Sequence, residues 1–317
     1  MGSALVLGDR GSGLTTFVGL LYAAQLRLGT EDRDDFRFSA DRETIRQLES
    51  IYGELVAGRF PEWDADWDTH PLSFLFAFRS GKLGAVSFGG NGERDFDSVR
   101  VRVGGISVEE VAEFTEHDAV LEESTRRLLR SPVVLPLVDA SRLRPPPEGP
   151  KDPALTRYDR MLATTLEVVD RFLLAERDRK ARTMHPLFVV TKFDLCPPAT
   201  LAEVQAPAGP PSAWPPKERD LVGRKILDLF FPVTTLVLLA MEARRRSTVA
   251  PPSWFYSGLQ LAIGTNGKRI ARRSRLPVGG WEPEYPFEEY RDLIEQLAKL
   301  AHRLRGSDGQ AGEESSD

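Results

Sequence analysis

Short apolar runs alternate with amphipathic stretches along most of this chain. Apolar residues at helical spacing predict a helix over Thr15–Leu28, ending at Gly29, and a second helix over Asp41–Ala57. Further helices are expected at Val108–Phe114, Leu121–Leu129, Leu155–Ala181, Glu218–Leu229 and Phe287–Arg305. Apolar and β-branched runs predict strands at Ser3–Leu7, Leu72–Phe78, Leu83–Phe88, Val99–Val103, Val133–Val138, Leu187–Val190, Val233–Ala240 and Trp254–Ile263.

This alternation predicts an α/β fold, a doubly wound and mainly parallel sheet flanked by helices. The neighbouring strands within residues 72–88 predict one antiparallel edge, which makes the sheet mixed. We expect a single domain over residues 1–305, with two proline-rich insertions at 143–153 and 197–216 that lack regular structure. Residues 306–317 hold four acids and no base, and predict a disordered acidic tail.

Charge and cysteine content narrow the class of protein. The chain has 42 Lys and Arg against 47 Asp and Glu, a net charge of −5 that is mostly in the tail, so nucleic acid is an unlikely partner. Cys196 is the single cysteine, and the start of the chain has no leader pattern, so we expect a cytoplasmic protein. The apolar run Ile226–Met241 is short and contains Asp228 and Pro232, which argues against a membrane span.

A glycine-rich loop lies between the first predicted strand and the first predicted helix. It fits the phosphate-binding pattern GxxxxGK[ST] except at one position, where Leu14 replaces the lysine. Glycines let backbone N–H groups turn toward an anion, and the helix N-terminus adds partial positive charge. Thr15 would place its hydroxyl on Mg²⁺. The candidate nucleotide-binding residues here are Gly8, Asp9, Arg10, Gly11, Ser12, Gly13, Leu14, Thr15 and Thr16.

A second motif, Thr191-Lys192-Phe193-Asp194, directly follows the predicted strand Leu187–Val190. Together with the glycine-rich loop it resembles the [NT]KxD guanine-specificity motif of the Ras-like, TRAFAC-class P-loop GTPases. The resemblance implies that Asp194 accepts hydrogen bonds from the two adjacent donors of guanine and that the stem of Lys192 covers the base. It covers roughly residues 3–264 and implies GTP or GDP as the ligand, with Mg²⁺.

Two other elements of that family are altered or weakly placed here. In the DxxG motif, whose best candidate is Arg102-Val103-Gly104-Gly105, Arg102 replaces the aspartate. The switch-I threonine matches Thr30 or Thr69, and the backbone contact to guanine matches Ala240–Met241 or Ala262–Gly264.

The altered positions both serve the γ-phosphate and Mg²⁺, whereas the guanine motif is intact. We therefore expect a pseudo-GTPase that binds guanine nucleotide, hydrolyses it slowly or not at all, and acts through protein partners as a regulatory or scaffold component. One alternative is an active GTPase in which Arg10, Arg102 or a partner's arginine supplies the missing charge. Another is a scaffold that has lost nucleotide binding.

Three surface segments are candidates for partner contacts. The aromatic and acidic segment 59–69 lies where switch I would fall and predicts either a partner surface or an anchor over the sheet edge. The basic runs Arg244–Arg246 and Lys268–Arg275 predict solvated loops, with anionic lipid or an acidic partner as alternatives. The four histidines show no metal-ligand spacing.

Overall fold

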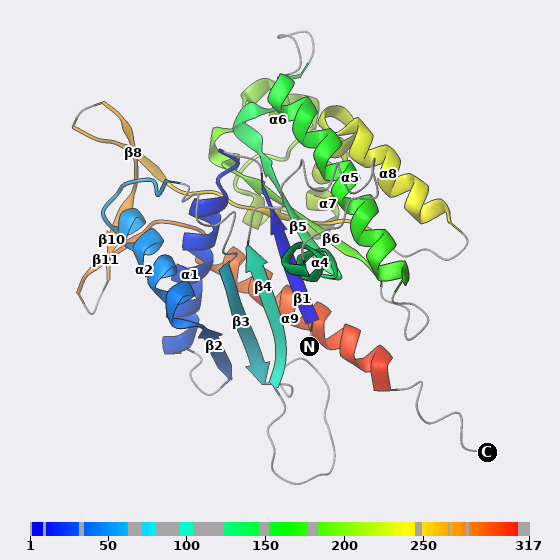
Figure 1. The fold of residues 1–317 in the computed structure, drawn as a ribbon. Helices are drawn as coiled ribbons and strands as arrows, with labels where there is room; N and C mark the ends of the chain where they lie inside the picture. The colour runs from blue at the N-terminus through cyan, green and yellow to red at the C-terminus, as the bar shows by residue number, and fades with distance from the viewer. Residues whose placement is uncertain are drawn as a thin grey trace.

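A computed structural model describes residues 2–8, 11–31, 35–62, 72–79, 96–103, 123–145, 152–175, 183–244, 249–265, 267–276 and 279–309. A seven-stranded sheet forms its centre, in the order β2-β3-β4-β1-β5-β6-β7 (Figure 1). The strands are β1 (Gly2–Leu7), β2 (Phe36–Ala40), β3 (Leu72–Arg79), β4 (Phe96–Val103), β5 (Val133–Asp139), β6 (His185–Thr191) and β7 (Ser253–Tyr256).

The sheet is mixed, and its antiparallel part is at one edge. β4, β1, β5, β6 and β7 pair in parallel, whereas β3 pairs antiparallel with both β2 and β4. The prediction of a mainly parallel α/β sheet with an antiparallel edge is confirmed. Because all the central parallel strands point the same way, their carboxyl ends meet at one edge of the sheet, which is where ligands bind in open α/β folds.

Helices cover both faces of the sheet (Figure 1). The helices α1 (Leu14–Glu31), α2 (Arg42–Val56) and α9 (Phe287–Gly309) share a core with one face. On the other face lie α4 (Glu123–Leu129), α5 (Pro153–Ala175), α6 (Pro198–Glu203), α7 (Pro216–Phe230) and α8 (Pro232–Ala243). Two small antiparallel pairs join β8 (Leu261–Ile263) to β9 (Arg269–Ala271) and β10 (Arg273–Arg275) to β11 (Trp281–Pro283).

The two cores explain why the central strands are continuous apolar runs. In β1, Ala4 and Val6 face the α1 side, whereas Leu5 and Leu7 face the α5 side. β6 repeats this alternation, with Phe188 and Val190 on the α5 side. Successive side chains of a strand point to opposite faces, so a sheet covered on both faces needs apolar residues at every position.

The prediction of a strand at Val233–Ala240 is wrong, because this segment is the helix α8. Pro232 occupies the first helical turn, where a missing N–H costs nothing. The buried carboxylate of Asp159 accepts hydrogen bonds from the N–H groups of Val233 and Thr234, at 3.1 and 2.9 Å. A run that is apolar at nearly every position has no period that separates a buried strand from a helix.

Three smaller differences have physical causes. α1 continues past Gly29 to Glu31, since burial of Leu28 outweighs the cost of about 1 kcal/mol for one helical glycine. Residues 197–216 are not free of regular structure, because α6 and the 3-10 turn η5 (Pro211–Ala213) begin at prolines that suit a first turn. The segment Trp254–Ile263 is two strands, β7 and β8, in different sheets.

β2 was not predicted, and neither were β9 to β11. The candidate elements at Leu83–Phe88 and Val108–Phe114 lie outside the described residues, as does the end of the predicted helix Leu155–Ala181 beyond Ala175. α9 extends to Gly309, within the segment expected to be disordered, and residues 310–317 are outside the described part.

No single helix among the described residues has both the length and the apolar composition to cross a bilayer. α7 and α8 reach that threshold only as a pair, and a bend of 115° separates them.

Candidate functional site

The glycine-rich loop joins the end of β1 to the start of α1. Gly11 and Gly13 have positive φ angles of 82° and 85°, a backbone region that side chains disfavour. Gly8 has no room for a side chain, since a Cβ there would lie 2.6 Å from the Ser12 hydroxyl. The loop therefore needs its glycines for its own geometry, and it ends at the N-terminus of the 18-residue helix α1.

Two features of this loop are suited to an anion. The first N–H groups of α1 have no carbonyl of their own helix to bind, and they carry the positive end of the helix dipole. The hydroxyl of Ser12, a residue only 2 % exposed, has no hydrogen-bond partner among the described residues. A buried hydroxyl without a partner costs about 1–3 kcal/mol, which a bound ligand oxygen would recover.

Leu14 behaves as a core residue. It is 3 % exposed and belongs to the same apolar core as Val6 and Leu137. Its Cβ lies 3.4 Å from the point where a Cβ of Gly8 would be, so it sits against the inner side of the loop. Position 14 thus supplies packing to the loop and no positive charge.

The Thr191–Asp194 turn contacts the loop directly, across nearly 180 residues of sequence. The Thr191 hydroxyl donates to the carbonyl of Ser12 at 2.5 Å and also lies 3.2 Å from the carbonyl of Val138. The ammonium of Lys192 donates to the carbonyl of Gly11, and to the Asp139 carboxylate at 2.7 Å. Lys192 holds a left-handed backbone, φ 51°, which costs a non-glycine residue about 1 kcal/mol.

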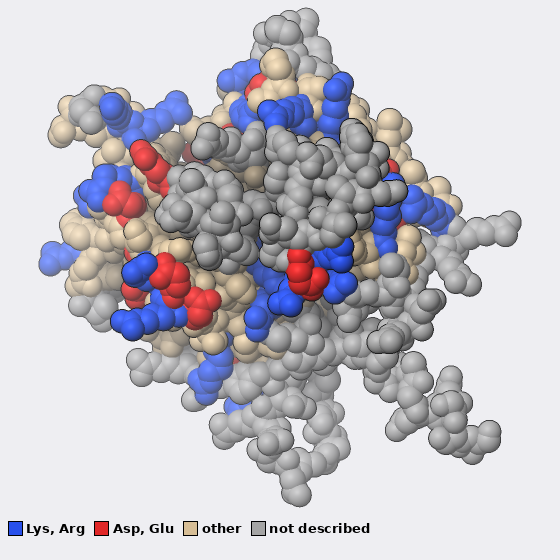
Figure 2. Space-filling view, viewed as in Figure 1, with Lys and Arg blue, Asp and Glu red and all other residues tan. Residues whose placement is uncertain are grey.

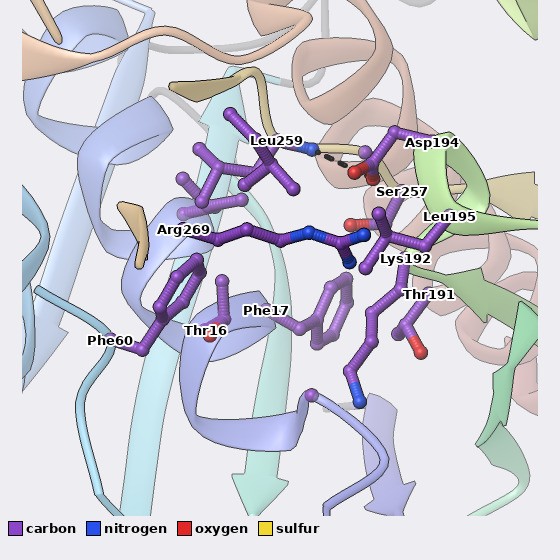
Figure 3. Close-up of a pocket in the computed structure, with 14 residues that line it drawn as sticks. Thr16, Phe17, Phe60, Thr191, Lys192, Asp194, Leu195, Ser257, Leu259 and Arg269 are labelled. Carbon is purple, nitrogen blue, oxygen red and sulfur yellow. Dashed lines mark hydrogen bonds between the residues drawn. The ribbon is translucent and has the colours of Figure 1, made fainter. Parts of the chain in front are cut away.

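Asp194 begins the far side of the site, in the 3-10 turn η4 (Phe193–Leu195). Its carboxylate accepts a long hydrogen bond, 3.5 Å, from the N–H of Leu259 in the segment after β7 (Figure 3). Burial raises the pKa of the Asp194 carboxyl above its ordinary value, while the Leu259 N–H and the charge of Arg269 act in the opposite direction. Asp194 is nevertheless exposed at the rim of the site, so its carboxylate is an accessible acceptor.

A cavity of about 240 Å³ lies between these two motifs (Figure 3). Its wall is mostly apolar, and polar groups approach from a few points. Ligand sites in proteins have this mixture, in which apolar walls supply burial and a few polar groups fix orientation. The side chains that line it include Phe17, Leu20, Phe60, Lys192, Asp194, Leu195, Leu259 and Arg269.

Arg269 extends across this cavity from β9 (Figure 3). Its guanidinium turns toward the side where Leu195, Ser257 and Asp194 lie. A planar guanidinium can stack on an aromatic ring as well as pair with a carboxylate. Arg269 therefore belongs to the site, although the sequence placed it only in a solvated basic run.

The sequence missed the segment Ser257–Leu259 as well. Ser257 and Gly258 line the cavity and Leu259 contacts Asp194. No local pattern marks these residues, which the predicted strand Trp254–Ile263 included; they join the site because they follow β7, which pairs in parallel with β6. The expected candidate Ala240–Met241 is instead part of α8, and Met241 is fully buried in the core. Ala262–Gly264 runs along and past β8.

The remaining predicted residues are placed as follows. Thr15 is buried and Thr16 lines the cavity, whereas Asp9 and Arg10 are outside the described residues. Thr30 is in the last turn of α1 and donates to the carbonyl of Arg27, which removes it as a switch-I candidate. Thr69 and residues 63–71 lie outside the described part, so of the segment 59–69 only Phe60 is seen to reach the cavity.

Arg102 is engaged away from the loop. Its guanidinium donates to the carbonyl of Arg127 at the end of α4, at 2.7 Å. Burial, together with the charges of Arg100 and Arg127, lowers the pKa of Arg102 from its ordinary value. The neighbouring glycines 104 and 105 are outside the described residues.

The described residues do not by themselves form a magnesium site. Thr15 offers one hydroxyl, and in the part of the chain that the structure covers no three His, Cys, Asp or Glu residues gather as metal ligands. Mg²⁺ prefers several oxygen ligands in octahedral geometry and is often held jointly by protein and phosphates. Any magnesium here would depend on the oxygens of a bound ligand.

A larger cavity of about 860 Å³ adjoins the first one behind Asp194. Cys196 lines it, and burial raises the pKa of this thiol to about 11. A thiol with so high a pKa is protonated at neutral pH and is a poor nucleophile. The cysteine therefore adds no covalent chemistry to the site.

No protein-family model matches this chain, and no curated protein matches it in sequence. The site must therefore be interpreted from its own residues.

Proposed function

We propose that this chain is a divergent P-loop protein of the Ras-like GTPase type that binds guanine nucleotide and turns it over slowly or not at all. The observation that carries the proposal is the direct contact between two distant motifs. Thr191 and Lys192 bind the carbonyls of Ser12 and Gly11, so the expected base-binding and phosphate-binding segments border one cavity. A nucleotide needs that arrangement, with one end for the base and the other for the phosphates.

In this proposal the base occupies the apolar cavity. Asp194 accepts from the two adjacent N–H donors of guanine, a pair that adenine lacks, and the Leu259 N–H lies within reach of the same base edge. The aliphatic stem of Lys192 lies along one side of the base. The cavity is slightly smaller than the range of about 300–1,000 Å³ typical of whole drug-sized ligands, which suits a base alone.

The phosphates would extend from the cavity toward the N-terminus of α1. Backbone N–H groups and the helix dipole bind them there, and the Ser12 hydroxyl is the nearest side-chain group without a partner among the described residues. Since Leu14 brings no charge, the β- and γ-phosphates lose their usual cation. Loss of one preorganised charge commonly lowers a rate about 10²–10³-fold, which supports a protein that holds nucleotide and works through partners.

The alternative of an active GTPase that uses Arg102 has less support, because its guanidinium is bound to the Arg127 carbonyl. Arg10 and a partner's arginine stay open for that role. The alternative of a nucleotide-free scaffold is favoured by one observation, the burial of Leu14 against the inner side of the loop.

Calorimetric titration of nucleotide-free protein with GTP, GDP and ATP, with and without Mg²⁺, tests the proposal. We expect both guanine nucleotides to bind with similar affinity, little effect of Mg²⁺, and much weaker binding of ATP. Equal binding of ATP and GTP would remove Asp194 as the specificity residue. If no nucleotide binds, the alternative of a nucleotide-free scaffold is favoured instead. Multiple turnover of GTP by the purified protein would contradict impaired hydrolysis.

A further inference from the structure

α8 exposes an apolar stripe that no described part of the chain covers. Its buried side is formed by Thr234, Leu238 and Met241. On the opposite side Leu236 is 67 % exposed and Leu239 is 55 % exposed. We define the apolar stripe as the exposed residues Val233, Leu236, Leu239, Ala240 and Ala243; the exposed acid of α8 is Glu242, near the end of the helix.

α5 runs beside α8 and in the same direction. Asp159, near the start of α5, accepts from the N–H groups that begin α8. Eleven residues later on α5, Asp170 pairs with Arg244 at the end of α8, at 2.7 Å. These two ties set the helices side by side along the whole length of α8 (Figure 1).

The exposed side of α5 is basic. Arg157, Arg160 and Arg171 are exposed at helical spacing along α5, with Glu167 as the acid among them. We call these three arginines the basic stripe. Arg244 is exposed at the end of α8, where it pairs with Asp170. Lys and Arg side chains lie beside uncharged ones at the edge where α5 and α8 lie (Figure 2).

We propose that the α5–α8 face docks on the surface of a membrane that contains anionic lipids. Helices that lie in the membrane interface combine an apolar face, which enters the acyl boundary, with basic residues that meet the lipid phosphates. Here α8 supplies the apolar residues and the neighbouring helix α5 supplies the basic ones. The inference does not depend on nucleotide binding, because none of these residues lines the nucleotide cavity.

Two other occupants fit the face less well. The helices α5 and α8 are about 35 and 18 Å long and about 10 Å wide each, so a second copy seated on both would cover about 500 Å², below the roughly 800 Å² per partner of a stable dimer. The acidic segment 306–317 of this chain has no large apolar residue to cover leucines. A lipid surface needs neither a large area nor a shaped partner.

Sedimentation with vesicles tests the proposal on the full chain. We expect binding to vesicles of mixed phosphatidylcholine and phosphatidylglycerol, weaker binding to phosphatidylcholine alone, and loss of the difference at high salt. Leu236→Glu should weaken binding to the mixed vesicles about tenfold or more, since a charge would have to enter the acyl boundary. Arg160→Gln and Arg171→Gln should each weaken it about fivefold, equivalent to about 1 kcal/mol per arginine near an anionic surface.

Ile263→Glu is the matched control. Ile263 is 70 % exposed on β8, at the opposite side of the molecule in Figure 1, and should leave vesicle binding unchanged. Thermal unfolding of each variant confirms that it is folded. No binding to the mixed vesicles, or equal loss in Leu236→Glu and Ile263→Glu, would overturn the proposal. A dimer that Leu236→Glu dissociates would assign the face to a second copy instead.

Discussion

The two ends of the proposed nucleotide site differ in what the chain supplies. At the base end, Lys192 and Asp194 are held by the loop carbonyl of Gly11 and by the Leu259 N–H, at the wall of a preformed cavity. At the phosphate end, the loop keeps its glycines and its helix N-terminus, but position 14 has become part of the core. In the proposed function, Lys192 and Asp194 would recognise the base, whereas position 14 supplies no charge to stabilise a departing phosphate. Such a site is suited to recognition more than to reaction.

The largest expected effect is at the base end, in the variant Asp194→Asn. Two charge-assisted hydrogen bonds to guanine would be lost, at about 1.5–3 kcal/mol each, so affinity for GDP should fall about 10²- to 10⁴-fold. Xanthine nucleotide, which carries a carbonyl where guanine carries an amino group, should gain from the amide donor of asparagine. Calorimetric titration with guanine and with xanthine nucleotide measures this change in relative affinity.

Glu289→Gln is the control for this loss of charge. Glu289 lines the adjoining cavity, which Asp194 also lines, and its carboxylate is buried. The variant should bind GDP as the natural sequence does. An equal loss in both variants would mean that charge near the cavity, and not Asp194, determines affinity.

The next effect concerns the phosphate end, in the variant Leu14→Lys. A lysine at this buried position places an ammonium without a partner in the core, and we expect the free protein to lose about 3 kcal/mol of unfolding free energy. GTP should then raise the melting temperature more than it does for the natural sequence, because the triphosphate pairs with the new charge. Leu14→Met, which keeps the volume, should change neither quantity. Unaltered stability and unaltered GTP affinity would show that position 14 does not face the phosphates.

The variant Thr191→Val tests the contact between the Thr191–Asp194 turn and the glycine-rich loop, because valine keeps the shape of threonine and removes its hydroxyl. The buried carbonyls of Ser12 and Val138 would lose a donor, at a cost of about 1–2 kcal/mol in unfolding free energy. Thr200→Val is matched to it, because the Thr200 hydroxyl donates to the buried carbonyl of Leu143, at 2.6 Å. Both variants should unfold at a lower denaturant concentration than the natural sequence does, and only Thr191→Val should weaken GDP binding. Normal GDP affinity in Thr191→Val would separate the two motifs functionally.

The smallest effect is the dependence of binding on pH. Burial raises the pKa of Asp194, so its carboxylate takes up a proton at a higher pH than an ordinary aspartate does. Because guanine needs the ionised acceptor, GDP affinity should fall as the pH is lowered, up to about tenfold for each pH unit below that pKa. For folding the sign is opposite, since a raised carboxyl pKa lets the free protein gain stability as the pH falls through it. Asp194→Asn should abolish the dependence, and its persistence in that variant would assign it to another group.

The sequence predicted the parts of the molecule whose patterns are local. The glycine-rich loop after β1 and the Thr191–Asp194 turn after β6 stand where strand ends were expected, because turns and strand ends depend on neighbouring residues. α8 was mistaken for a strand, since its capping carboxylate, Asp159, is 74 residues away in the sequence. Arg269 and Leu259 were missed for the same reason. Their roles come from tertiary placement beside Asp194, and the basic run that contains Arg269 has no pattern that indicates a cavity.

The bonds from Thr191 and Lys192 to the loop carbonyls join the two motifs through the chain's own atoms. The relative placement of the motifs is therefore part of the fold itself. In the proposed function, occupancy then follows mass action, and it rises and falls with the concentration of free guanine nucleotide. A GTPase that hydrolyses its ligand acts as a timer, because the rate of hydrolysis limits how long the GTP-bound form lasts. A protein that binds guanine nucleotide with little turnover would instead respond to the concentration of that nucleotide.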